Sequence, residues 1–373
     1  ELTDEVLGKA LCGKKGIWAR VWRIVYIKII FSTSILLSYL ILFNSFSAHA
    51  QDFQKGINID IARKDYSLKS LKKIVDTIHE NNGDYLQLHF SDNENYAIES
   101  QFFKHENISS QNYLSQQELK NLIHYSNKLN IMVVPEFDLP SHSKAWLLLL
   151  KNENSNLHEN IVSDYSDETI DFFSNQKALE ISKRQIKEIL DLFHQPNFQK
   201  EQRIVLGGDE VPGGKSYQND FINFMNEIGE YAYQNGYEPQ IWNDSITKNG
   251  LKLLKNYFSV IYWKQSNNEN NEPGITVEDF LDYNFKVYNY NFYSLYFLPS
   301  KNYSPTDIEE QTSYISWAYN HNSFYYLKNP YYEVDSLNIQ GSALSFWGEH
   351  ATGMREEEVL NQELPLIRTY LNK

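Results

Sequence analysis

The sequence predicts an α/β protein whose single domain is a (β/α)8 TIM barrel, and three observations support this prediction. Strand-like and helix-like segments alternate about eight times over residues 51–373, with no linker or low-complexity block between them. The strand-like segments are short apolar runs, as expected of strands buried on both faces. Charged and aromatic residues gather where these runs end, which is where such barrels carry their active sites. A doubly wound open sheet is the alternative.

The expected strands are bounded by polar or turn-forming residues. The first, G-I-N-I-D-I-A-R, alternates apolar and polar residues and ends in an arginine. The fourth is a β-branched run that two glycines follow directly. Strands are expected at residues 56–63, 85–90, 131–137, 204–206, 240–244, 259–263, 286–291 and 342–347.

The expected helices show apolar residues at helical spacing and recognisable ends. In the first, residues 68, 71, 74, 75 and 78 are apolar, and Asn81-Asn82-Gly83 ends the helix. Ser115 and Glu118 form a capping box at the start of the second. Helices are expected at residues 68–80, 115–129, 177–193, 221–233, 277–283 and 356–371. The longer segments 93–114, 139–176 and 292–338 are expected to be loops on the catalytic face.

Residues 1–50 have the pattern of a secretory signal peptide. A basic start precedes an apolar run at residues 29–43, and Ser47-Ala48-His49-Ala50 offers small residues for cleavage. We therefore expect residues 51–373 to form the mature, secreted, extracellular protein; an uncleaved membrane anchor is the alternative. Cys12, the only cysteine, lies in this leader, so the mature chain has no disulfide.

The charge of the chain restricts its partners. The formal net charge is −14, and the leader holds more basic than acidic residues, so the mature chain is more acidic still. This balance argues against binding to nucleic acid or to an anionic membrane, and favours a neutral or cationic partner. Aromatic residues make up 15% of the chain, and exposed aromatic rings can stack against sugars.

The segment R-I-V-L-G-G-D-E-V-P-G-G at residues 203–214 is the centre of the expected site. Two adjacent carboxylates, Asp209 and Glu210, follow the buried strand and its two glycines. In parallel α/β proteins this position belongs to the active site. The alternative is a solvated Asp-Glu turn.

The other strand ends carry a matching set of polar and aromatic residues. They are Asp60, Arg63, His89, Asp92, Glu136, Asp138, His142, Trp242, Asn243, Asp244, Trp263, Asn289, Asn291, Tyr293, Tyr296, Trp347 and Glu349. Three tryptophans at one barrel mouth suggest an apolar box for a sugar ring or an acetamide methyl group. Carboxylates and an arginine suit sugar hydroxyls.

Other chemistries fit the sequence less well. A zinc site could be formed by His89, Asp92, Asp138 and His142. Barrel metallohydrolases, however, carry H-x-H on one strand, and this chain has Q-x-H at residues 87–89. We therefore expect no metal and no other cofactor. The sequence has no G-x-S-x-G elbow, no P-loop and no dinucleotide fingerprint.

Taken in order, these motifs resemble glycoside hydrolase family 20, the β-N-acetylhexosaminidases. The resemblance covers residues 56–349 and rests on D-I-A-R (60–63), L-H-F-S-D (88–92), P-E-F-D-x-P-x-H (135–142), G-G-D-E (207–210), W-N-D (242–244), Y-W (262–263), N-Y-N-x-Y-x-L-Y (289–296) and W-G-E (347–349). E-N-Y-A-I-E-S at residues 94–100 is similar to the branch that cleaves poly-β-1,6-N-acetylglucosamine of biofilm matrix.

The resemblance implies a role for each matching residue. Glu210 would be the general acid and then the base, Asp209 would hold the acetamido N–H, and Tyr296 would bind the acetamido oxygen. The residues implied in substrate binding are Arg63, His89, Asp92, His142, Trp242, Asp244, Trp263, Trp347 and Glu349. The family's route is substrate-assisted and retaining, because the substrate's own carbonyl oxygen attacks C1.

The partner implied is a polysaccharide or oligosaccharide that contains β-linked N-acetylglucosamine. The alternatives are an exo-acting hexosaminidase on chitooligosaccharides or glycoconjugates, and a carbohydrate-binding barrel without turnover. The chain departs from the family at Val205 and Gln87, where histidines are usual. The loop Val211-Pro212-Gly213-Gly214 also lacks the tyrosine of the polymer-cleaving branch.

Overall fold

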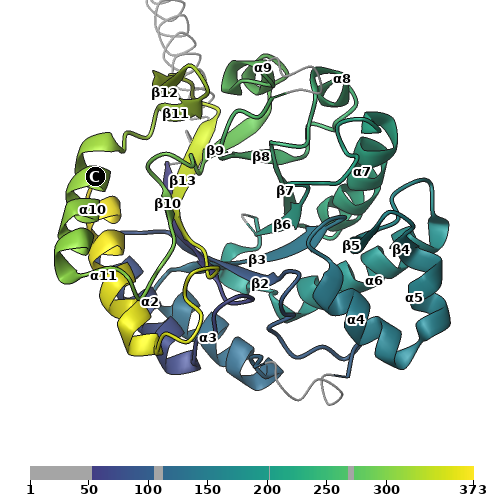
Figure 1. The fold of residues 1–373 in the computed structure, drawn as a ribbon, viewed down its shortest axis with the longest axis horizontal. Coiled ribbons are helices and arrows are strands. Elements are labelled where there is room, and N and C mark those ends of the chain that lie inside the picture. The colour runs from purple at the N-terminus through teal and green to yellow at the C-terminus, as the bar shows by residue number, and fades with distance from the viewer. Residues whose placement is uncertain (1–52, 105–111, 201, 268–272) are drawn as a thin grey trace, which may run out of the picture. The chain divides into compact units, whose positions relative to one another are not determined.

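The core of the protein is a closed barrel of eight parallel strands (Figure 1). The computed structural model describes residues 53–104, 112–200, 202–267 and 273–373, so the predicted leader lies outside the described residues. The barrel strands are β1 (Gln54–Asp60), β2 (Tyr85–Ser91), β3 (Met132–Leu139), β6 (Arg203–Gly207), β7 (Glu238–Trp242), β8 (Ser259–Tyr262), β9 (Lys286–Asn289) and β13 (Ile339–Phe346).

Closure of the barrel decides between the two predicted topologies. Strand β1 pairs in parallel with β2 on one side and with β13 on the other. An open doubly wound sheet would leave both edges unpaired, so that alternative is wrong and the TIM barrel is confirmed. The short strand β10 (Tyr296–Phe297) pairs in parallel with Ser345 and Phe346 at the end of β13, beyond the residues of β13 that pair with β9.

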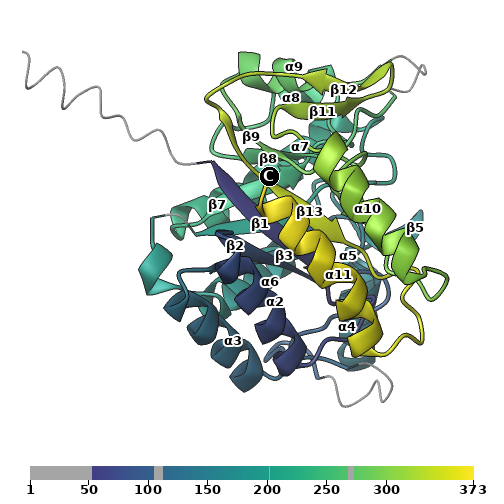
Figure 2. The same cartoon turned by 90° about the vertical axis from the view of Figure 1, so that its left-hand side faces the viewer.

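Helices surround the barrel, as the views along and across it show (Figures 1 and 2). They are α2 (Leu68–Glu80), α3 (Gln116–Lys128), α4 (Lys144–Glu153), α5 (Ser155–Ile161), α6 (Gln176–Leu192), α7 (Gln218–Gln234), α8 (Lys248–Leu251), α9 (Val277–Asp282), α10 (Pro305–Ala318) and α11 (Glu356–Leu371). The predicted capping box is present, because the Ser115 hydroxyl accepts from the Glu118 N–H while the Glu118 carboxylate accepts from the Ser115 N–H.

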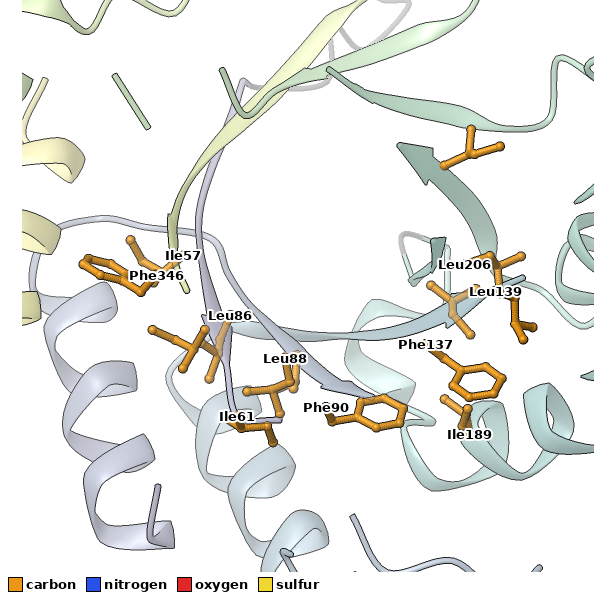
Figure 3. Packing of buried hydrophobic residues seen from close by; sticks show 14 of the residues in the cluster. Ile57, Ile61, Leu86, Leu88, Phe90, Phe137, Leu139, Ile189, Leu206 and Phe346 are labelled. Atoms are coloured by element: carbon orange, nitrogen blue, oxygen red, sulfur yellow. The ribbon is translucent and has the colours of Figure 1, made fainter. Parts of the chain in front are cut away.

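Alternation along the strands separates the core from the site. On β2, the buried side chains of Leu86, Leu88 and Phe90 belong to the main apolar core (Figure 3). Gln87 and His89 alternate with them and face the barrel interior, where their side chains reach polar groups of β3. The same alternation on each strand brings inward-facing residues together at the carboxyl ends.

The opposite end of the barrel is filled by aromatic rings around one arginine. The buried Arg203 guanidinium lies 4.5 Å from the ring centre of Tyr85 and 4.8 Å from that of Tyr288. The Arg203 Nη1 also donates a 3.0 Å hydrogen bond to the Tyr288 hydroxyl. These cation–π contacts stabilise a buried charge and close the barrel below the site.

Two segments expected to be loops contain regular structure. Residues 139–176 hold α4 and α5 with the hairpin β4 (Val162–Ser163) and β5 (Ser166–Ile170), and residues 292–338 hold α10 with the hairpin β11 (Ser323–Tyr326) and β12 (Asn329–Glu333). The expectation of loops was wrong because apolar residues in these elements do not recur with the spacing of a helix or a strand. Helix α4 is an almost continuous apolar run, and β12 is largely exposed.

Among the described residues, no helix combines the length and the apolarity needed to cross a bilayer.

A buried carboxyl group in α11 leads to a stability prediction. Burial raises the pKa of Glu363 to about 8, although the Tyr66 hydroxyl donates to it at 2.5 Å and opposes the shift. From about pH 4.3, the usual glutamate value, to about pH 8, the folded chain keeps a proton that the unfolded chain releases. Stability should therefore fall as pH rises through this range.

Glu363→Gln should remove this pH dependence, because an amide does not titrate. We expect the variant to melt higher than the parent at pH 8, with a much smaller difference at pH 5, in thermal unfolding followed by circular dichroism. If the difference in melting temperature between variant and parent is the same at pH 5 and at pH 8, the pKa of Glu363 is not raised.

Candidate active site

A cavity opens at the carboxyl ends of the barrel strands, and its empty space is about 490 Å³ with the open mouth included. It is lined by Arg63, His89, Asp92, His142, Asp209, Glu210, Trp242, Trp263, Tyr290, Tyr296, Ser345, Trp347 and Glu349. Every residue to which the family resemblance gives a role is in this set except Asp244. Of the other strand-end residues, the lining does not include Asp60, Glu136, Asp138, Asn243, Asn289, Asn291 or Tyr293. Tyr290 and Ser345 were missed, because both face inward from strands whose pattern reads as core.

The backbone after β6 turns both acidic residues toward the cavity. Gly207 and Gly208 have φ of 77° and 88°, and a Cβ at either would lie 2.7 Å from the atoms of Leu139 or Ile241. Glu210 also has a positive φ of 46°, which costs free energy for a residue with a side chain. The position is therefore held by the surrounding structure rather than by local preference.

Asp244 does that holding. One of its carboxylate oxygens accepts from the Glu210 N–H at 2.9 Å, and the other accepts from the Trp263 indole at 2.9 Å. Asp244 lies outside the cavity lining, and its predicted part in substrate binding stays a prediction. Sequence placed it at the right strand end but could not show its partners.

His142 lies between the two acidic side chains. Its Nε2 is 3.6 Å from Asp209 Oδ2 and 3.7 Å from Glu210 Oε2, and its Nδ1 is 3.2 Å from Asp92 Oδ1. Burial alone would lower the pKa of His142, but the carboxylates of Asp209 and Asp92 outweigh it and raise the pKa to about 10. The imidazolium can therefore donate to Asp92 while it faces both acids.

Asp209 is the acid whose ionisation the site controls. Burial raises its pKa to about 7, helped by the negative charge of Asp244 and opposed by the cation of His142. Its Oδ1 has no hydrogen-bond partner among the described residues. Glu210 differs, since its side chain is 56% exposed. One carboxylate is thus enclosed in the pocket, and the other stands at its mouth.

Arg63 anchors the opposite wall. Its guanidinium pairs with Asp60 at 3.0 Å, Asp92 at 2.6 Å and Glu94 at 3.2 Å, and lies 5.9 Å from the ring centre of Trp347. Although burial opposes it, the surrounding carboxylates raise the pKa of Arg63, so it is always charged. A planar guanidinium fixed in this way suits bidentate recognition of ligand oxygens.

Three tryptophans and a tyrosine form an aromatic box. Trp242 and Trp347 lie 6.2 Å apart, Trp263 stacks on Tyr296 at 6.5 Å, and Tyr296 is 6.1 Å from Trp347. The buried carboxylate of Glu136 accepts from the Trp242 indole at 2.8 Å and fixes that ring. These walls are apolar and rigid, as a pocket for a methyl group or a sugar face requires.

A possible metal-binding group lies beneath this box. Ligand atoms of His89, Asp92 and Asp138 lie within 4.8 Å of one another. The Asp92 carboxylate, however, already contacts His89 Nε2 at 2.7 Å and the Arg63 guanidinium at 2.6 Å. A metal would have to compete with these cationic partners, so this donor set is poorly suited to one.

Comparisons with known proteins agree with this geometry. Residues 54–362 match the model of the glycosyl hydrolase family 20 catalytic domain. Curated relatives include β-hexosaminidase subunit beta of Entamoeba histolytica, 26% identical over 222 residues (52% of this chain and 38% of the relative), and β-hexosaminidase A of Caenorhabditis briggsae, 26% identical over 220 residues (55% and 34%). The chain spans about a third of the length of these curated relatives.

Solved structures extend the match. Dispersin B superposes with a TM-score of 0.77 and 27% identity, over 86% of this chain and 99% of that one. An exo-β-N-acetylglucosaminidase from Vibrio harveyi, at 16% identity, shares the fold with a TM-score of 0.59 over 85% of this chain and 54% of that one. The ordered motifs, the barrel and the match over most of the described residues lead to one conclusion: this chain belongs to glycosyl hydrolase family 20.

Proposed function

We propose that the chain is a β-N-acetylglucosaminidase that cleaves β-linked N-acetylglucosamine with retention of configuration. The observation that carries this proposal is the Asp209–Glu210 pair over an aromatic box, with one carboxylate enclosed and one at the mouth. The matches to β-hexosaminidases support it.

The two carboxylates divide the reaction between them. Glu210 gives its proton to the glycosidic oxygen, the bond from that oxygen to C1 breaks, and the substrate's acetamido carbonyl oxygen bonds to C1. Asp209 accepts a hydrogen bond from the acetamido N–H and stabilises the positive charge that develops there. Water then attacks C1, the bond between C1 and the acetamido oxygen breaks, and Glu210 takes the proton that the water loses. No enzyme nucleophile is needed.

The surrounding residues position the sugar. The aromatic box encloses the acetamide methyl, and the Tyr296 hydroxyl binds the acetamido oxygen. Arg63 and Glu349 hold sugar hydroxyls. Asp244 acts through others, because it fixes the Glu210 backbone and the Trp263 ring. His142 completes the site by holding its positive charge beside both acids.

For the natural substrate, we propose poly-β-1,6-N-acetylglucosamine of biofilm matrix, met outside the cell after residues 1–50 are removed. The E-N-Y-A-I-E-S segment and the likeness to dispersin B over nearly all of that chain support this choice. A second candidate is an exo-hexosaminidase on chitooligosaccharides or glycoconjugates, and the curated relatives are β-hexosaminidases.

A direct test uses purified protein and four substrates. We expect hydrolysis of an aryl N-acetylglucosaminide, none of the matching aryl glucoside, and faster cleavage of β-1,6-linked polymer than of chitooligosaccharides. Activity on the glucoside would contradict the substrate-assisted route. Preference for chitooligosaccharides would favour the second candidate, and binding without products would indicate a carbohydrate-binding barrel. EDTA should leave the rate unchanged.

A further inference from the structure

A continuous set of aromatic rings leads from the cavity mouth onto the outer surface. We call this set the aromatic ramp, and it consists of Phe292, Tyr293, Tyr314, Trp317, Tyr325 and Tyr331. All six belong to residues 292–338, the segment between β9 and β13. Figure 1 shows its elements α10, β11 and β12 on the sector of the barrel beside β9 and β13.

The ramp begins at the catalytic box itself. The ring centre of Phe292 is 6.1 Å from that of Trp263 and 5.0 Å from that of Tyr296. Phe292 then contacts Tyr325 at 5.8 Å, and Tyr325 contacts Tyr293 at 6.2 Å. The first part of the ramp is therefore continuous with two walls of the cavity.

The ramp ends on an exposed tryptophan. Tyr293 contacts Tyr331 at 4.9 Å, and Tyr331 contacts Trp317 at 5.5 Å. The ring of Tyr314 also contacts the first and the last of these three residues, with its centre 5.9 Å from that of Tyr293 and 6.4 Å from that of Trp317. Contacts between neighbouring rings thus run without a break from Trp263 to Trp317.

The exposure of these rings sets them apart from core aromatics. Trp317 is 71% exposed, Phe292 42% and Tyr331 38%. An exposed tryptophan that continues a row of half-exposed rings is unusual on a protein surface, and such patches mark binding sites.

Hydrogen bonds fix the rings in place before any ligand arrives. The hydroxyls of Tyr293 and Tyr331 lie 2.7 Å apart, and the Tyr314 hydroxyl donates to the Tyr293 carbonyl oxygen at 2.7 Å. These bonds join α10, β12 and the turn after β9. A ligand would therefore meet a rigid surface and would lose little entropy in ordering it.

We propose that the aromatic ramp binds the part of a β-linked N-acetylglucosamine polymer that extends beyond the sugar in the cavity. Sugar rings present apolar C–H faces that stack on aromatic rings, while their hydroxyls stay in water. Continuity with the box suits one chain that occupies both the cavity and the ramp. This inference rests on the proposed function, because it assigns the ramp to the same substrate.

The test compares a polymer with a substrate too small to reach the ramp. The variants are Trp317→Ala and Trp317→Ala/Tyr331→Ala. The control is Tyr233→Ala, which removes a 55% exposed ring that stacks on Tyr257 at the end of α7. We expect the double variant to lose about tenfold in kcat/KM on β-1,6-linked polymer, and the control to lose nothing. The kcat/KM on an aryl N-acetylglucosaminide should stay unchanged in all three.

Binding separates this inference from the proposed function. In a Glu210→Gln background, in which turnover of the polymer is strongly slowed, the double ramp substitution should weaken retention of the chain on immobilised polymer by a similar factor. Equal retention with and without the ramp residues would overturn the inference, whether or not the parent is active. Lack of activity on every substrate would instead reject the proposed function. An equal loss of kcat/KM on polymer and on aryl glycoside would also overturn the inference, because it would indicate that the ramp residues have a structural role.

Discussion

Glu210→Gln should lower kcat on an N-acetylglucosaminide by about 10²–10⁴-fold. The glutamine side chain keeps the size and position of Glu210 at the cavity mouth but has no proton to give to the leaving oxygen. The loss should be largest for substrates with poor leaving groups, such as the polymer. It should shrink for aryl glycosides whose leaving groups need no protonation.

The check is steady-state kinetics on a series of aryl N-acetylglucosaminides with leaving groups of different acidity. The parent should show a shallow dependence on leaving-group pKa, and the variant a steep one. An unchanged melting temperature would show that the substitution leaves the fold intact. A near-parental rate on the poorest leaving group would remove Glu210 from the mechanism.

Asp209→Asn should cost about 10²–10³-fold in kcat, comparable to the loss of one preorganised charge-stabilising group. The amide cannot supply the negative charge that stabilises the intermediate beside the acetamido group. Because the pKa of Asp209 is raised to about 7, the parent loses its active carboxylate as pH falls below that value. The kcat/KM of the parent should therefore decline on the acid side of about pH 7.

The pH profile gives this prediction a second readout. The decline of kcat/KM below about pH 7, which we call the acid limb, should be absent from Asp209→Asn. The asparagine does not ionise, so the residual rate of this variant should not depend on pH in this range. Glu349→Gln changes another carboxylate of the cavity and is the matched control, so it should keep the limb. An acid limb that survives in Asp209→Asn at the same pH would assign it to another group.

Most of the site was predictable because of how a barrel is built. Each strand has an ordinary apolar pattern, so a polar or aromatic residue just past its end is conspicuous, as with Asp209, Glu210 and Trp347. The closed barrel then gathers all the strand ends at one mouth. Sequence order was therefore enough to place these residues together without knowledge of any distance.

What the sequence could not show has an equally physical origin. Asp244 sits at a strand end like the others, but its carboxylate is used by the Glu210 N–H and the Trp263 indole, and no sequence pattern reports which backbone group a side chain reaches. Tyr290 lies within one of the motifs but was not predicted for the site, because a tyrosine in an apolar strand is typical of a buried core residue. The hairpin of β11 and β12 was not predicted because β11 is buried almost throughout and β12 is largely exposed, so neither strand alternates between buried and exposed residues.

The pairing of β1 with β13 also determines when the cavity is complete. Asp60, at the end of β1, accepts a 2.9 Å hydrogen bond from the Gly348 N–H across 288 positions of sequence. Arg63 and Trp347, which form one wall of the cavity, follow these same two strands. We expect contacts between residues so far apart in the sequence to form late in folding, because a long loop must close before they are made. A nascent chain whose β13 is still inside the ribosome thus has its acidic pair but only half a sugar pocket, and recovery of activity during refolding should report barrel closure rather than helix formation.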